Sequence, residues 1–150
     1  MYDLKAVLHQ YCIDYVQNRI DSVAHAIHAS QQSANEETKS SADDRYETGR
    51  AMAQQEADRN AGQLNEANKL MAALKRIPIS ATSAIAQPGS LVHTDHGNFY
   101  IAISAGTFMI DDETYFALSQ ASPIGAKLTG CKAGDSFDMN GKQYKIIAVY

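Results

Sequence analysis

Hydrophobic and small residues in the first half of the chain recur at alternating spacings of three and four. Two stretches, 13–34 and 46–74, carry this pattern, which is typical of helices that pack against one another lengthwise. The positions are Ile13, Val16, Ile20, Val23, Ile27, Ser30 and Ala34, then Tyr46, Gly49, Ala53, Ala57, Asn60, Leu64, Ala67, Met71 and Leu74. We predict a long antiparallel helical hairpin, a coiled coil, over 1–77, with its tip near 36–43.

Local composition also favours two helices. Residues 3–76 contain no proline and are rich in Ala, Gln, Glu, Asn and Arg, which mostly favour helix. Ser40 or Ser41 would cap the second helix, with Asp43 and Asp44 in its first turn, near the positive end of the helix dipole. The alternative is a four-helix bundle in which a second copy of the chain supplies the other two helices.

The pattern changes after Pro78. Residues 78–90 form a linker of mostly small residues, and beyond it the hydrophobic positions follow the alternation of strands. The turn signal Asn140-Gly141 is typical of a β-hairpin. We predict strands over 90–94, 98–104, 107–110, 136–139 and 142–149.

Two short helices are predicted between these strands. One covers 112–119. The other begins after Ser122, a good N-cap residue, with Pro123 at the first helical position, and ends at Gly130. Residues 91–150 are therefore predicted to form a small α+β domain, and the fold class of the chain is α+β.

Charge and composition narrow the classes of function. The net charge is −4, with 9 basic and 11 acidic residues in 1–78 and 4 and 6 in 91–150. This balance argues against binding of naked nucleic acid through its phosphates. No apolar run approaches the length of a membrane span, and the first residues do not resemble a signal peptide, so we expect a soluble cytoplasmic protein with no membrane partner. Cys12 and Cys131 have no CxxC partner, and both are expected to be buried, small apolar side chains.

Few residues have the spacing of a metal-binding or catalytic site. His25 with His28, and His93 with His96, are three residues apart. Neither pair has a third ligand fixed by spacing, so solvated histidines are expected. No GxSxG, P-loop or GxGxxG motif is present, and hydrolase or nucleotide-binding functions therefore have no support.

One segment of the second half is similar to a known family. Residues 121–135 read Ala-Ser-Pro-Ile-Gly-Ala-Lys-Leu-Thr-Gly-Cys-Lys-Ala-Gly-Asp. The segment resembles the signature of the C-terminal domain of Gre-type transcript cleavage factors, in which Ser-Pro-Leu/Ile opens a short helix, a Gly ends it and an acidic residue leads into the final hairpin. The matches are Ser-Pro-Ile at 122–124, Gly-x-Lys at 130–132 and Gly-Asp at 134–135. The resemblance implies an FKBP-like fold for 91–150, preceded by a coiled-coil hairpin.

The predicted tip carries the second part of the resemblance. Gre factors have an acidic tip motif, Gly-Asp-x-Ser-Glu-Asn-Ala-Glu-Tyr, whose Asp and first Glu are three residues apart. Residues 43–49 read Asp-Asp-Arg-Tyr-Glu-Thr-Gly, and Asp44 and Glu47 occupy those two positions. The departures are Asp43 for Gly, Tyr46 for Ser, Thr48 for Asn, Gly49 for Ala, Arg50 for Glu and Ala51 for Tyr.

The resemblance implies a function exerted on RNA polymerase. The hairpin would enter the secondary channel, where Asp44 and Glu47, with Asp43 as a further candidate, would hold a Mg²⁺ ion in the active site of the polymerase. The chain would not be an enzyme itself: it would stimulate cleavage of backtracked RNA by the polymerase, contact RNA only indirectly and carry no cofactor when free. The resemblance also implies polymerase docking around Ser122, Pro123, Ile124, Gly125 and Gly130.

Two other functions stay open at this point. The departures at the tip leave room for a regulator that occupies the secondary channel without stimulating cleavage. The second alternative is a non-catalytic module that dimerises through its helices. Acidic residues in the first turn of a helix also have a purely structural use, because each stabilises the helix dipole by about 0.3–1 kcal/mol.

Overall fold

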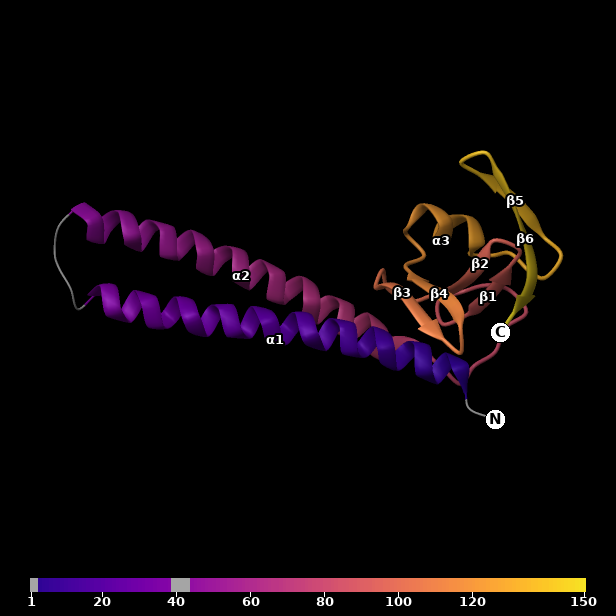
Figure 1. Ribbon diagram of the computed structural model, residues 1–150, viewed down its shortest axis with the longest axis horizontal. Helices are drawn as coiled ribbons and strands as arrows, with labels where there is room; N and C mark the ends of the chain where they lie inside the picture. The colour runs from indigo at the N-terminus through magenta and orange to yellow at the C-terminus, as the bar shows by residue number, and fades with distance from the viewer. Residues whose placement is uncertain (1–2, 39–43) are drawn as a thin grey trace. The chain divides into compact units, whose positions relative to one another are not determined.

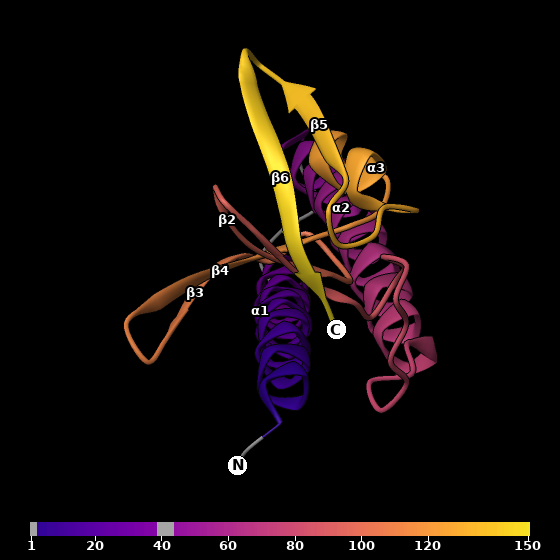
Figure 2. The same ribbon diagram turned by 90° about the vertical axis from the view of Figure 1, so that its right-hand side faces the viewer.

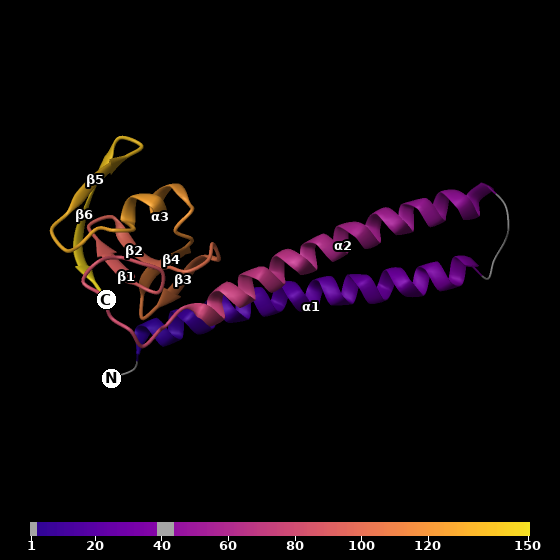
Figure 3. The same ribbon diagram turned by 180° about the vertical axis from the view of Figure 1, so that it is seen from behind.

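Two long helices form the first half of the chain. The computed structural model describes residues 3–38 and 44–150, and the side chains of these residues except those of 33–48. α1 (Leu4–Thr38) and α2 (Asp44–Arg76) lie side by side and run antiparallel (Figures 1 and 3), so the predicted helical hairpin is confirmed. The predicted caps Ser40 and Ser41 fall outside the described residues. No helix in the described part of the chain combines the length and hydrophobicity needed to cross a membrane.

The hairpin from residue 16 to residue 71 is one of two compact units, and 3–15 together with 72–150 form the other. Within the hairpin unit, Val16, Asn60 and Ala67 are buried at their predicted seam positions. Towards the tip most seam residues are only half-buried, and one of them, Ala57, is exposed. Small seam residues cover little area, which explains the shallow burial. The amide Nδ2 of Asn60 is buried and has no hydrogen-bond partner among the described residues.

The second half of the chain builds a six-stranded mixed sheet. Its strands are β1 (Leu91–Thr94), β2 (Gly97–Ile101), β3 (Gly106–Ile110), β4 (Glu113–Leu118), β5 (Ser136–Met139) and β6 (Lys142–Val149). Their order is β3-β4-β2-β1-β6-β5, and only β2 and β4 pair in parallel. The hairpins β3–β4 and β5–β6 lie at opposite ends of the sheet (Figure 2), and one short helix, α3 (Pro123–Leu128), precedes β5. The α+β class is confirmed, and the strand predicted over 98–104 ends early, at Ile101.

The helix predicted over 112–119 is wrong, because this segment forms β4. Asp111 and Asp112 have φ angles of 50° and 66°. Asp tolerates this left-handed conformation, which turns the chain from β3 into β4. Along β4, Tyr115 is buried while its neighbour Phe116 is exposed, as expected for a period of two. Pairing with β3 on one side and β2 on the other outweighs the local tendency of the segment to form helix.

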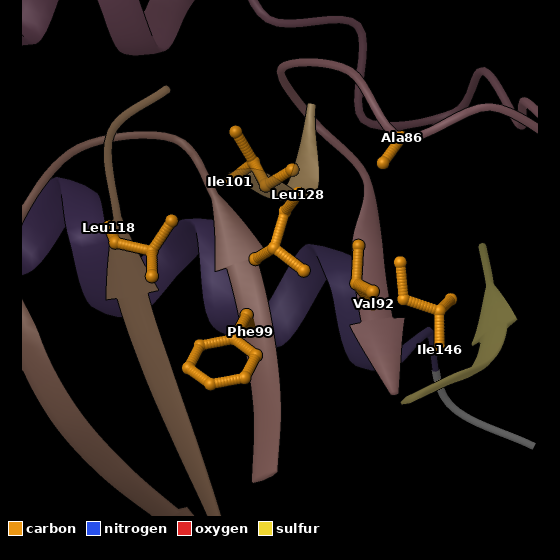
Figure 4. Close-up of a cluster of buried hydrophobic side chains, with 7 residues drawn as sticks. All are labelled: Ala86, Val92, Phe99, Ile101, Leu118, Leu128 and Ile146. Carbon is orange, nitrogen blue, oxygen red and sulfur yellow. The ribbon is translucent and has the colours of Figure 1, made fainter. Parts of the chain in front are cut away.

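The core of the domain lies on one face of the sheet. Seven buried side chains form a cluster there (Figure 4): Ala86, Val92, Phe99, Ile101, Leu118, Leu128 and Ile146. Leu128 belongs to α3, so this helix covers the face. The segment before β1 joins in, since the backbone of Ala86 exchanges hydrogen bonds with Gly130 and Cys131 at 2.7–2.8 Å. Full burial of one large aliphatic or aromatic side chain stabilises a fold by about 1.5–3 kcal/mol.

The first turns of α1 cover the opposite face. On β2, Tyr100 alternates with Phe99 and is hydrogen-bonded to α1 through His9. Tyr11 stacks on Phe108 of β3, with ring centroids 5.0 Å apart. α1 also contributes Cys12, which is buried as predicted. The same prediction is wrong for the other cysteine, Cys131, which is only half-buried because it lies just beyond the end of α3.

Candidate functional site

The predicted acidic site lies at the start of α2. Asp44 is the first residue of this helix and Glu47 is the fourth, so the backbone has the i, i+3 spacing that the sequence indicates. Asp43 precedes the helix and lies outside the described residues, as do the side chains of Asp44 and Glu47. The pairing of these carboxylates stays a prediction from the sequence.

The predicted docking segment forms α3 and its two ends. Ser122 is the N-cap: its Oγ accepts a hydrogen bond from the N–H of Gly125 at 3.1 Å and donates one to the carbonyl of Ser119 at 2.7 Å. Pro123 takes the first helical position, where its missing N–H costs nothing because that group has no partner within a helix. Beyond the helix, Gly130 adopts a φ of 90°, which favours glycine.

Gly125 is buried where no other side chain fits. A Cβ atom at this position would lie 1.9 Å from the carbonyl oxygen of Ser119. That oxygen is held by Ser122, whose N–H and hydroxyl both donate to it. The Ser122–Gly125 pair therefore fixes the junction between β4 and α3, which is a structural role.

The surface that α3 offers to a partner is small. Pro123 and Lys127 are exposed, and so is Gly130 just beyond the helix. Ile124 is half-buried and packs against the core cluster. Of the five predicted docking residues, Pro123 and Gly130 are thus the most accessible, and Lys127 adds a positive charge that the sequence analysis did not select.

A series of aromatic rings extends from the core to the surface next to α3. We call it the aromatic row: Phe116, Phe99, Tyr144, Phe137 and His96. Phe99 stacks on Phe116 with ring centroids 5.4 Å apart and lies 6.4 Å from Tyr144. Tyr144 in turn stacks on Phe137 at 5.0 Å and meets the edge of His96 at 5.2 Å. Phe116 is 37% exposed, so part of the row is accessible to a partner.

The aromatic row and α3 lie on the same face of the sheet. Phe99 and Leu128 belong to one core cluster, against which Ile124, Phe137 and Tyr144 also pack. Partly exposed aromatic side chains over a packed core are enriched at protein–protein interfaces. No local sequence pattern indicates the row, because its rings come from four strands and one turn and meet only through strand pairing.

Three of the four paired histidines are exposed, as expected, but His93 is half-buried. His25 and His28 are exposed on α1. The Nδ1 atom of His93 is hydrogen-bonded to Oδ1 of Asn98, and its ring packs edge-on against Tyr150 at 5.3 Å. Among the described side chains, no three His, Cys, Asp or Glu residues gather closely enough to hold a metal ion.

No family model matches the chain, and no curated protein matches it. A functional proposal therefore rests on the fold, on the residues above and on the resemblance of the two short segments.

Proposed function

We propose that this chain is a Gre-like transcription elongation factor, which binds RNA polymerase, inserts its hairpin in the secondary channel and promotes cleavage of backtracked RNA. One observation supports it best: a long helical hairpin precedes an α+β domain in which the segment similar to the Gre signature forms a capped helix. The arms of the hairpin unit are 16–38 of α1 and 44–71 of α2, so at 1.5 Å per residue they are about 35 and 42 Å long. A pair of helical arms of this length is suited to a narrow channel.

The chemistry would lie in the carboxylates at the start of α2. Asp44 and Glu47 are three residues apart in a helix, and residues at this spacing are neighbours on a helix surface. Carboxylate oxygens suit Mg²⁺, which commonly takes one or two protein carboxylates and keeps several waters. When bound, the ion supplies an activated water and charge stabilisation for hydrolysis. Asp44 and Glu47 would hold and orient it, and Asp43 would add negative charge. All other catalytic groups would belong to the polymerase.

Docking would use the face that carries α3 and the aromatic row. Pro123 and Lys127 are exposed on the helix, and Phe116 presents part of its ring nearby in the same domain. Aromatic contact area with polar neighbours matches the composition of protein interfaces. A net charge of −4 makes a protein surface of the polymerase a better partner than its nucleic acid.

A cleavage assay on a stalled, backtracked elongation complex tests the proposal. With the cognate polymerase, we expect the chain to accelerate release of the 3′ RNA fragment. Asp44→Asn and Glu47→Gln should each reduce that stimulation by at least about 10-fold, because each removes a carboxylate from the metal site. Glu56→Gln is the matched control, since Glu56 is exposed on the same helix away from the tip. Undiminished stimulation by both tip variants would refute the assignment.

Other outcomes separate the alternatives. Binding to polymerase without any stimulation of cleavage would indicate a secondary-channel regulator that lacks cleavage activity. The dimerising module has its own support, because Ile20, Val23 and Ile27 are only half-buried in the hairpin seam. A dimer in light scattering that does not bind polymerase would favour that module over the elongation factor.

A further inference from the structure

A buried histidine joins two elements of the unit formed by 3–15 and 72–150. His9 of α1 is 6% exposed, and its Nδ1 atom lies 2.8 Å from the hydroxyl of Tyr100 on β2, which is fully buried. The backbone of Leu74 on α2 lies near this ring and raises its pKa, an influence smaller than that of burial. The two aromatic rings meet edge-on, with an interplanar angle of 86°.

The hydroxyl of Tyr100 suits a neutral His9. A neutral imidazole donates from one nitrogen and accepts at the other, so with the proton on Nε2 the Nδ1 atom accepts from the hydroxyl of Tyr100. A hydrogen bond to a buried polar atom lowers the cost of its burial.

The groups around the ring do not compensate a positive charge. On α1, Lys5 lies one turn before His9 and is itself buried, with its Nζ donating to the carbonyl of Ala81 at 2.8 Å. Cys12, one turn after His9, is a buried thiol. The carboxylate of Asp3, at the start of the helix, accepts from the N–H of Lys5 at 3.0 Å, and its charge raises the pKa of Tyr100. From β2 the ring contacts the hydroxyl of Tyr100.

We propose that His9 forms a pH-sensitive contact, which holds the first turns of α1 against the sheet when the ring is neutral and loosens them when Nδ1 takes up a proton. The hydroxyl of Tyr100 can rotate to accept from a protonated ring, but it brings no negative charge. Burial lowers the pKa of His9 below its ordinary value, in the direction this arrangement requires. The unfolded chain therefore binds the proton first, so stability is complete above the ordinary histidine pKa of about 6.5 and falls as the pH drops below it.

Thermal unfolding of the full chain between pH 8 and pH 5 tests the proposal. In His9→Gln, the amide group can replace the hydrogen bond to Tyr100 but does not titrate. We expect the melting temperature of the wild type to fall more steeply below pH 6.5 than that of His9→Gln. His28→Gln is the matched control, since His28 is exposed on the same helix, and it should keep the wild-type profile. Parallel pH profiles of the wild type and His9→Gln would overturn the proposal.

A second measurement needs no variant. An NMR titration of the wild-type histidine rings should show one ring, assigned to His9, whose midpoint lies below the ordinary histidine range. Hydrogen exchange at pH 5.5 should then show weaker protection in β2 and the first turns of α1 than at pH 7.5, after correction for intrinsic rates, while β5 and β6 stay protected. An ordinary midpoint for His9 would overturn the proposal even if His9→Gln does not fold.

Discussion

Replacing Gly125 by alanine should destabilise the C-terminal domain strongly, although the change adds only a methyl group. The new Cβ would lie 1.9 Å from the carbonyl oxygen of Ser119, about 1.5 Å short of ordinary van der Waals contact at 3.4 Å. The obstacle is backbone, held by two hydrogen bonds from Ser122, so it cannot rotate away as a side chain would. Either the N-cap or the end of β4 has to move.

The size of the effect follows from these contacts. Overpacking a well-packed site costs about 1–3 kcal/mol, and occasionally more. Displacing Ser122 also weakens an N-cap worth about 1 kcal/mol. We therefore expect a loss of about 2–4 kcal/mol in the free energy of unfolding of the domain. For a domain of this size, that loss lowers the melting temperature by at least about 8 °C.

Near-UV circular dichroism during heating and urea titration is the suitable assay, because it reports the packing of tyrosine and phenylalanine in the domain. Gly62→Ala, followed by far-UV circular dichroism of the helices, is the control of opposite sign: Gly62 is exposed in the middle of α2, in the hairpin unit, and a Cβ there meets nothing within 4 Å. Alanine at that position should stabilise the helix by about 0.5–1 kcal/mol. A loss of 1 kcal/mol lowers the melting temperature by about 4–8 °C. A Gly125→Ala protein that unfolds within about 2 °C of the wild type would therefore refute the expected clash between the new Cβ and the carbonyl of Ser119.

Two further predictions concern other parts of the same domain. In urea denaturation, Ser122→Ala should lower the free energy of unfolding by about 0.5–2 kcal/mol, because the N–H of Gly125 loses its acceptor. Ser122→Asp should recover most of that loss. Equal stability of all three proteins would contradict the capping role. In the native protein, a thiol reagent should modify Cys131, whereas Cys12 should react only after the chain unfolds. Cys12 is buried, and burial raises the pKa of its thiol to about 12. Equal labelling rates of the two cysteines in a time course would contradict this difference.

Local signals were sufficient for the features that depend on neighbours along the chain. The three-four spacing predicts both long helices because a helix places those positions on one stripe. Ser122 and Pro123 indicate where α3 begins, and Asn140-Gly141 indicates the β5–β6 hairpin, because caps and tight turns are decided by a few adjacent residues.

Features that join distant segments needed the tertiary structure. Residues 113–118 form β4 because β3 and β2 pair with them on both sides. The parallel pairing with β2 cannot be predicted from residues that are neighbours in the sequence. The aromatic row combines rings from several strands, and the residues of the hydrogen-bonded pair His9 and Tyr100 are 91 positions apart in the chain. The sequence by itself determined the helices, turns and caps, since their energies are local. Only the tertiary structure decided which side chains meet, because packing and burial depend on residues that are far apart in the chain.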